Sequence, residues 1–288
     1  MTRKNFQLDR RALFSSAAAA ALLAASGVSA SGLPEKGGRL RMALSGATRS
    51  DGWSKGDGLF MQVARQGMVF DSLTEVAADG TLRAELATSW RAQDEGRVWQ
   101  FDLRSDVAFH DDCLLTSKDV VASLAPLLSG EVTAVGAFGV EMAFSEPMTD
   151  LPLVLSQPEF VIRPAHDLSG AIGTGLYRVV CFEPGQRLLT KRVSSHYKDG
   201  TAGWFDEVEL TSIPSEAVRG QALGEFLVDA ADLQDLRVVA GFADVTVMPS
   251  SARPSYAVLS EVAQPMRVSD LRPLDNLRAA ERWWFAKS

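Results

Sequence analysis

The chain has 288 residues, of which 46% are hydrophobic and 23% are charged, so it can bury a core and is neither disordered nor fibrous. Its formal net charge of −7 disfavours nucleic acid and anionic lipid as partners, because both repel an acidic protein. This length fits one large domain or two modest ones.

The first thirty residues are typical of an export signal. Basic residues open the segment, an alanine-rich apolar run follows, and small residues occupy positions 28–30. We therefore expect cleavage after Ala30 and a periplasmic mature protein. The run is too short and too mildly apolar to span a bilayer, so we expect no direct membrane anchor. Arg10 and Arg11 resemble a twin-arginine signal, although adjacent arginines also occur in ordinary signals.

The next segments alternate between strand and helix patterns. Residues 39–44 alternate apolar and polar side chains, which predicts a half-buried strand. Residues 45–58 are rich in Gly, Ser, Thr and Asp and show neither the two-residue alternation of a strand nor the spacing of a helix. We therefore expect a surface connection. Residues 59–69 place apolar side chains at helical spacing and predict an amphipathic helix.

The clearest strand pattern lies at residues 98–103, where Trp99, Phe101 and Leu103 share one face. We expect a core strand, and we interpret these aromatic residues and Trp90 as core filling rather than as ligand-stacking groups.

Turn and capping signals follow this strand. Asp111 and Asp112 predict a turn, since aspartate tolerates left-handed backbone. Thr116 and Asp119 have the spacing of a capping box, which predicts a helix that ends at Gly130. Farther along, we expect a hairpin formed by 176–180 and 188–190 around Pro184-Gly185, a strand at 208–213, a helix at 215–223 and a last helix capped by Asp275.

The two cysteines and three histidines give no strong site pattern. Cys113 and Cys181 could pair in an oxidising compartment, but we favour two separate buried thiols. His110 beside Asp111 is more typical of a local hydrogen-bonding pair than of an acid/base relay. The histidines are scattered and the common hydrolase motifs are absent, so we expect no catalytic residues, no metal and no cofactor.

A series of short motifs occurs in a fixed order along the chain. They are 79–82 (DGTL), 85–90 (ELATSW), 99–104 (WQFDLR), 107–111 (VAFHD), 116–120 (TSKDV), 173–177 (GTGLY) and 205–208 (FDEV). Together they resemble the extracellular solute-binding proteins of family 5, the dipeptide and oligopeptide group that serves ABC importers. The resemblance implies a non-catalytic protein whose partners are a small peptide or peptide-like solute and the permease subunits of an ABC transporter.

The resemblance also implies the fold and its division. We expect an α/β fold: a periplasmic binding protein-like lobe, with a mixed sheet flanked by helices, and an inserted α+β subdomain. Residues 31–67 and 166–288 would form the main lobe and residues 68–165 the insertion. Too few residues separate Ala231 from the tail at Pro273 to form a typical domain, so we expect the second lobe to be largely absent. A cleft open on one side would bind solute weakly, or a partner would supply the missing wall.

The candidate ligand-binding residues are Ser45, Thr48, Asp51, Trp53, Arg163 and Thr174. The resemblance places loop 45–58 at the cleft, where its hydroxyls and carboxylate offer hydrogen bonds and its tryptophan an apolar surface. The arginine, which precedes Pro164, can bind a carboxylate through two parallel hydrogen bonds. The threonine lies between two glycines and would approach either a ligand or a crossing between substructures. For each of these residues, an ordinary solvated loop position remains the alternative.

Two other function classes remain open. A one-lobed derivative would act as a protein-interaction or regulatory module without delivering solute. An exported hydrolase is a remote alternative, because a catalytic site can assemble from residues that are distant in sequence.

Overall fold

The computed structural model describes residues 37–76, 81–200, 202–248 and 255–259. The predicted export signal, its cleavage site and the last helix lie outside these residues. Within them, no helix has both the length and the apolar character needed to cross a membrane.

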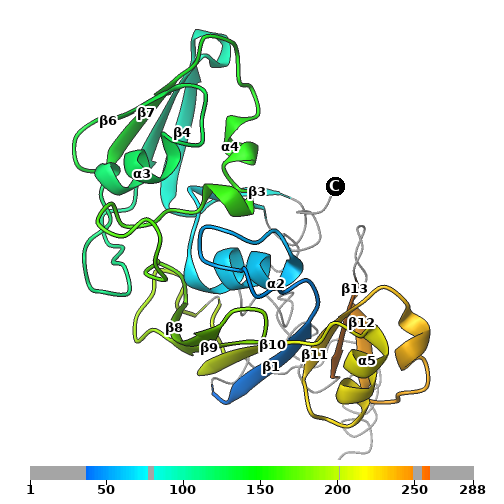
Figure 1. Cartoon of the computed structure of the whole chain (residues 1–288). Helices are drawn as coiled ribbons and strands as arrows, with labels where there is room; N and C mark the ends of the chain where they lie inside the picture. The colour runs from blue at the N-terminus through cyan, green and yellow to red at the C-terminus, as the bar shows by residue number, and fades with distance from the viewer. Residues whose placement is uncertain (1–36, 77–80, 201, 249–254, 260–288) are drawn as a thin grey trace, which may run out of the picture.

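The larger sheet has seven strands in the order β12-β13-β11-β1-β10-β9-β8 (Figure 1). The strands are β1 (Arg39–Leu44), β8 (Tyr177–Glu183), β9 (Arg187–Arg192), β10 (Glu207–Ser212), β11 (Ala230–Leu233), β12 (Val245–Met248) and β13 (Ser255–Leu259). Strand β1 runs parallel to both of its neighbours, β10 and β11, whereas the other pairs are antiparallel. The predicted strands at 39–44 and 208–213 and the predicted hairpin around Pro184-Gly185 are confirmed.

Helices cover both faces of this sheet. Leu40, Met42 and Leu44 of β1 pack with helix α2 (Leu59–Gln62) and the π-helix η1 (Val63–Val69), whereas Ala43 packs on the opposite face with α5 (Glu216–Gly224). The two-residue alternation of a strand produces this separation. Helix α5 begins after Ser215, whose hydroxyl accepts a hydrogen bond from Val218 N–H, and it includes Gly224 as its last residue.

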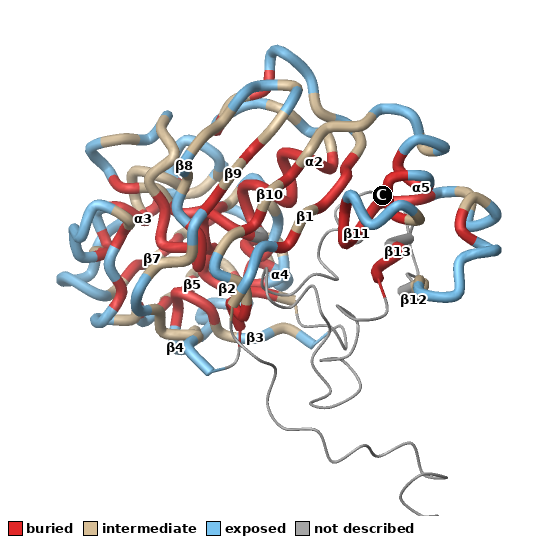
Figure 2. Tube along the Cα trace, turned by 90° about the horizontal axis from the view of Figure 1, so that it is seen from below, coloured by how far each residue is buried: buried red, intermediate tan, exposed pale blue. Residues whose placement is uncertain are grey.

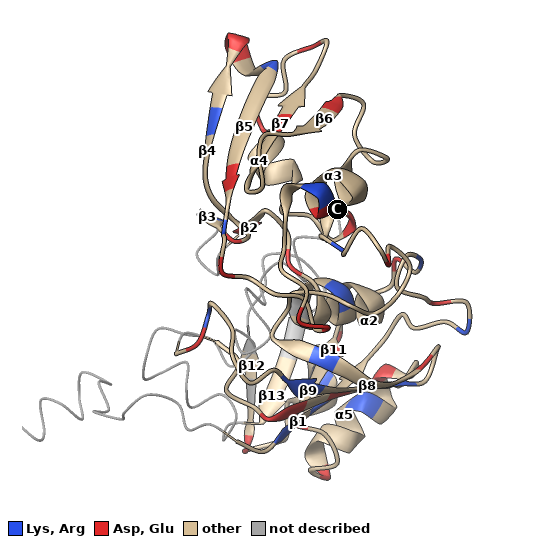
Figure 3. Cartoon of the chain, turned by 90° about the vertical axis from the view of Figure 1, so that its left-hand side faces the viewer, with Lys and Arg blue, Asp and Glu red and all other residues tan. Residues whose placement is uncertain are grey.

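The predicted amphipathic character of residues 59–69 is wrong, although the segment is helical. All four residues of α2 are buried, and Figure 2 shows the same segment as buried. The reason is visible in Figures 1 and 3, where α2 lies between the two sheets instead of on the surface. A helix enclosed on several sides has no solvent-facing stripe.

The smaller sheet has four antiparallel strands in the order β4-β5-β7-β6. Its strands are β4 (Ala87–Gln93), β5 (Val98–Leu103), β6 (Glu131–Ala134) and β7 (Gly139–Ala143). The remaining elements are the pair β2 (Thr74–Val76) and β3 (Leu82–Ala84), helices α3 (Ser117–Leu124) and α4 (Leu151–Val154), and the 3-10 turns η2 (Asp94–Gly96), η3 (Pro158–Phe160) and η4 (Leu236–Val239). The domain boundaries at 67/68 and 165/166 remain a prediction.

The second core forms around β5 and α3. Trp99, Phe101 and Leu103 are buried together, and Trp90 packs against them, as predicted. The capping box of α3 is confirmed, because the Asp119 carboxylate accepts hydrogen bonds from both Thr116 N–H and the Thr116 hydroxyl at 2.8 Å. The predicted end at Gly130 is wrong: α3 ends at Leu124. Pro126 has no N–H with which to continue the helical hydrogen bonds.

Two glycines allow the segment before β8 to pass directly over η1. A Cβ on Gly173 would lie 1.9 Å from the Val69 carbonyl oxygen, and a Cβ on Gly175 would lie 2.3 Å from the Met68 carbonyl oxygen. The backbones touch, since Gly175 N–H donates to Val69 O at 2.9 Å. The glycines on either side of Thr174 therefore serve a close crossing between substructures, one of the two alternatives expected for this motif.

We predict that Gly173→Ala destabilises the fold by about 1–3 kcal/mol, because the added methyl group forces two packed backbones apart. Urea unfolding would measure the change. Gly241→Ala is the matched control, since a Cβ at that position meets no atom within 4 Å. Equal stability of the two variants would contradict this account of the crossing.

Candidate functional site

The carboxyl end of β1 is a topological switch point of the larger sheet, where the helical connections pass to opposite faces. Strands β10 and β11 lie parallel to β1 on either side, and α2 and α5 cover opposite faces of the sheet (Figure 1). In open α/β sheets, ligands bind beyond the carboxyl ends of the strands at such a switch point. Ser45 and the loop that follows it begin at this edge.

Ser45 is held by a buried ion pair. Its N–H and hydroxyl donate to the Asp232 carboxylate at 2.8 and 2.7 Å. Arg219 lies against the same carboxylate at 3.3 Å, and both charged side chains are at most 4% exposed. In the structure, Ser45 therefore directs its polar groups into the protein. Sequence reasoning did not predict the pairing of Arg219 with Asp232, because the first lies on α5 and the second on β11.

Thr48 and Asp51 form hydrogen bonds with each other. The Thr48 N–H and hydroxyl donate to the Asp51 carboxylate at 2.8 and 2.7 Å. Asp51 and Trp53 are only 6% and 9% exposed, so the expectation of a plain surface connection for residues 45–58 is wrong in part. The loop folds back because Thr48 closes a local turn and Trp53 packs into the core.

Trp53 and Arg163 are brought together, and we name their surroundings the Arg163 cluster: Trp53, Arg65, Phe70, Arg163 and Phe182. The Trp53 ring lies 5.9 Å from Phe70 and 5.0 Å from Phe182, measured between ring centroids. The Arg163 guanidinium donates to the Trp53 carbonyl oxygen at 2.6 Å and lies 5.0 Å from the centre of the Phe70 ring. Aromatic rings and a guanidinium plane thus pack together in one cluster.

The Arg163 guanidinium is incompletely satisfied. Its Nε is buried and has no hydrogen-bond partner among the described residues, and no described carboxylate forms an ion pair with it. Burial, followed by the positive charge of Arg65, lowers the pKa of Arg163. A buried donor without a partner is unusual and calls for an explanation.

Arg65 adds a second positive charge to the cluster. It is 8% exposed and donates to the carbonyl oxygens of Met61 and Gly56. Burial lowers the pKa of Arg65, and the nearby Asp57 and Asp51 oppose this effect. The charge of Arg65 is therefore partly compensated by acids of loop 45–58, whereas for Arg163 the positive charge of Arg65 adds to the effect of burial.

Thr174 lies apart from this cluster, in a buried polar layer. Its hydroxyl donates to Asp71 at 2.9 Å, and both residues are at most 1% exposed. The Thr174 carbonyl oxygen lies 3.0 Å from His196 Nε2, while Nδ1 of the same ring accepts from Lys198 N–H at 3.1 Å. The surroundings thus match a neutral imidazole with its proton on Nε2. Of the predicted residues, Trp53 meets Arg163 and Thr48 meets Asp51, whereas Ser45 and Thr174 join neither pair.

His110 and the cysteines differ from expectation. His110 does not pair with Asp111, because its Nε2 lies 2.8 Å from the Gly175 carbonyl oxygen, and Asp111 pairs instead with His166 at 2.9 Å. Both thiols are free, but neither is buried: Cys113 is exposed and Cys181 is half-buried. Cys113 is exposed because it lies in a turn, and Cys181 is half-buried because it lies on a partly covered part of strand β8.

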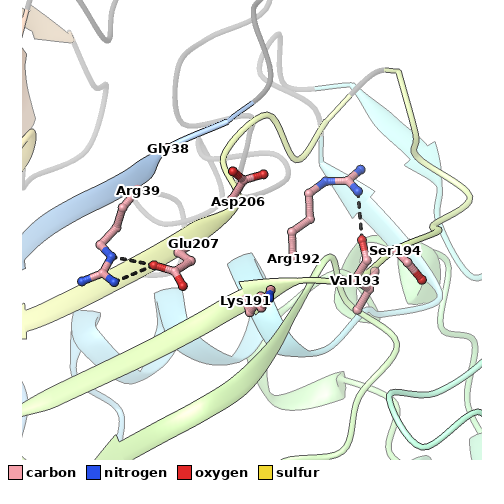
Figure 4. Close-up of a pocket in the computed structure, with 8 residues that line it drawn as sticks. All are labelled: Gly38, Arg39, Lys191, Arg192, Val193, Ser194, Asp206 and Glu207. Carbon is pink, nitrogen blue, oxygen red and sulfur yellow. Dashed lines mark hydrogen bonds and ion pairs between the residues drawn. The ribbon is translucent and has the colours of Figure 1, made fainter.

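A pocket of about 690 Å³ lies at the opposite, amino end of β1 and β10 (Figure 4). Two of its arginines already pair within the protein, since Arg39 binds Glu207 at 2.6 Å and Glu209 at 3.0 Å and Arg192 binds Asp199. Figure 3 shows acidic and basic residues interspersed over both sheets. The pocket is not at the switch point, whereas the loop that carries Trp53 begins there. We therefore place the candidate site at the Arg163 cluster.

The described architecture is that of periplasmic binding proteins. The structure resembles that of AgaA from A. tumefaciens R10 in complex with agropinic acid, with a TM-score of 0.68 and 24% identity, over 75% of this chain and 48% of that one. It also resembles AppA from Bacillus subtilis in complex with a nonapeptide, with a TM-score of 0.65 and 18% identity, over 75% and 48% of the two chains. The chain therefore spans about half the length of these proteins.

Residues 81–260 match the family model described as bacterial extracellular solute-binding proteins, family 5. The chain belongs to this family, as its motifs indicated. Among curated proteins it resembles the HTH-type transcriptional regulator SgrR of Salmonella typhi, with 35% identity over 166 residues, which are 53% of this chain and 29% of that one. The same regulator of Escherichia coli K12 is 33% identical over 172 residues, 54% of this chain and 30% of that one.

We predict that Arg219→Met destabilises the fold by about 3–5 kcal/mol, because it leaves the Asp232 charge buried without its partner. Chemical unfolding would measure the change. Arg237→Met is the matched control, since this side chain is 90% exposed in its pair with Asp235 and its loss should leave the unfolding free energy unchanged. Similar values for both variants would contradict the structural role of Arg219.

We also predict that acid destabilises the fold through His196. Burial, together with the charge of Lys198, lowers the pKa of His196 from 6.5 to about 4. Between pH 6.5 and about 4, His196 therefore binds a proton in the unfolded chain but not in the folded chain. The free energy of unfolding falls as the pH decreases through this range, by up to about 3 kcal/mol from this residue. Urea unfolding of the wild type and His196→Gln at pH 7.5, 5.5 and 4.5 would measure the difference. Identical pH dependence of the two proteins would show that the assignment is wrong.

Proposed function

We propose that this chain is a periplasmic substrate-binding component of an ABC importer and that it binds a small peptide or peptide-like solute through a carboxylate. The observation that carries this proposal is the buried Arg163 Nε, which has no hydrogen-bond partner among the described residues. The protein performs no catalytic step in this role. Export through the segment that ends at Ala30 and delivery to permease subunits belong to the same proposal.

The geometry of the Arg163 cluster supports an anionic solute. A guanidinium binds a carboxylate through parallel N–H donors, and here one of those donors is still unused. The Trp53 ring, packed against Phe70 and Phe182, provides the apolar surface beside it. A solute with an acid group next to an apolar portion fits this pairing.

Several structural neighbours were solved with solutes of this class, whereas others are nickel-binding or nickel-transport proteins. Two were solved with a nonapeptide and with agropinic acid, and DppA from Helicobacter pylori was solved with the peptide STSA, at a TM-score of 0.62 and 18% identity over 76% of this chain and 51% of that one. Peptides with free carboxyl ends and organic acids share the group that Arg163 would bind. Because the chain spans half of these neighbours, we propose that a partner or a second segment closes the site, and that affinity is otherwise weak.

A second candidate is a regulatory or protein-interaction module. It is favoured by the comparison with SgrR, a transcriptional regulator, to which this chain is 31–35% identical, whereas it is 17–24% identical to the solved solute-binding proteins. In this role, solute binding would alter contacts with a partner instead of feeding a transporter.

We predict that Arg163→Met weakens the binding of a short free-acid peptide by at least about tenfold, since a hydrogen bond to a charged group contributes about 1.5–3 kcal/mol. Isothermal titration calorimetry of the full chain with tripeptides would measure the dissociation constants. The same peptides with amidated carboxyl ends should bind the wild type as weakly as the free acids bind the variant.

Arg91→Met is the matched control, because this arginine lies on β4 with a side chain 60% exposed and should leave affinity unchanged. Equal affinity of the wild type for free-acid and amidated peptides would refute the carboxylate assignment. A wild type that binds none of the peptides would favour the regulatory candidate over the import role.

A further inference from the structure

Three side chains with metal-binding atoms meet at the surface between two loops. Asp111 and Cys113 lie in the turn between β5 and α3, and His166 lies in the segment between α4 and β8. One carboxylate oxygen, the Cys113 sulfur and a ring nitrogen of His166 all lie within 4.8 Å of one another. The cluster is separate from the Arg163 cluster and takes no part in the proposed binding of solute.

The distance between His166 and Asp111 is close to that between two ligand atoms of a bound ion. Ligand atoms of a tetrahedral zinc ion, at bond lengths near 2.0–2.3 Å, lie about 3.3–3.7 Å apart. His166 Nε2 and Asp111 Oδ2 are 2.9 Å apart through their hydrogen bond. A shift of less than about 1 Å would therefore open this pair and admit the ion, and rotation of exposed side chains supplies a shift of that size.

Both loops have their backbone held in place before any ion binds. The turn is closed by Phe109 N–H, which donates to the Cys113 carbonyl oxygen at 2.8 Å, and by the left-handed backbone of Asp112 with φ 67°. On the other side, Ala165 N–H donates to the buried Asp119 carboxylate at 2.8 Å. The backbone on each side of the cluster is thus fixed by hydrogen bonds that involve none of the three ligand atoms.

We propose that Asp111, Cys113 and His166 bind one divalent cation of the zinc class, with water in the fourth position. A thiolate, an imidazole and a carboxylate are the donor set of zinc and its neighbours, whereas magnesium and calcium prefer oxygen alone. On binding, the Cys113 thiol releases its proton to solvent, and His166 coordinates through neutral Nε2 in place of its hydrogen bond to Asp111.

The cation would cross-link two loops that are distant in sequence. The turn at 111–113 and the segment around His166 otherwise meet through the His166–Asp111 pair, whose side chains are 53% and 27% exposed. An exposed pair of this kind contributes little to stability. Coordination by both loops therefore stabilises their contact, and binding of the ion raises the unfolding temperature.

Cobalt(II) would test the site, because a cobalt–thiolate bond gives a near-ultraviolet charge-transfer band. The full chain, purified without a polyhistidine tag, should bind one Co²⁺ with this band, and Zn²⁺ should displace it. Cys113→Ser should abolish the band, and His166→Gln should weaken Co²⁺ binding by at least about tenfold. Circular dichroism would show that both variants remain folded, as expected for changes at exposed side chains.

Two matched controls test the specificity of the ligand set. Asp112→Asn changes a neighbouring acid of the same turn while keeping a side chain that tolerates left-handed backbone, and Cys181→Ser removes the other thiol. Both should retain the band and the affinity. A band that survives Cys113→Ser, a band lost in Cys181→Ser, or the absence of stoichiometric binding by equilibrium dialysis would overturn the proposal. An increase in unfolding temperature with Zn²⁺ in the wild type and not in Cys113→Ser would support it independently.

Discussion

The main sheet depends on how the carboxyl ends of β1 and β11 are tied together. Asp232 follows the paired residues of β11, and its carboxylate accepts from Ser45 at the end of β1 while it faces Arg219 from α5. Burying both charges costs free energy of hydration. The hydrogen bonds of Asp232 and Arg219 offset this cost. Arg219 also donates to the carbonyl oxygens of Ile213 and Pro214 at 2.6 and 3.0 Å. Arg219 thereby joins the ends of β10 and β11 to α5, and Asp232 joins the end of β1 through Ser45.

The two halves of the molecule are joined by close backbone contact and a buried polar layer. Gly173 and Gly175 let the chain cross η1 at contact distance. Thr174 between them bonds to Asp71, and its carbonyl oxygen meets His196. These hydrogen bonds hold the crossing in one arrangement. This rigidity places the four-stranded sheet at a defined position above α2.

Comparison of Arg219 with Arg163, which is half-buried, separates scaffold from candidate site. Arg219 directs its donors to a carboxylate and to backbone carbonyls inside the protein. Arg163 bonds to the Trp53 carbonyl oxygen, lies over Phe70 and leaves Nε without a partner among the described residues. A guanidinium held in position with an unused donor is prepared for a ligand from outside, whereas a fully bonded one is not. This contrast, rather than loop position, favours Arg163 over Ser45 as a binding residue.

Local patterns in the sequence determined much of the secondary structure. The alternation at 39–44 and 98–103, the capping box at Thr116 and the turn at Pro184-Gly185 each act within a few residues, so each was predictable. The motifs also identified the family. The full burial of α2, the pairing of Arg219 with Asp232 and the meeting of Asp111 with His166 were decided by tertiary structure alone. They depend on which separate segments the fold brings together, and composition or periodicity along the chain carries no information about which of these segments come into contact.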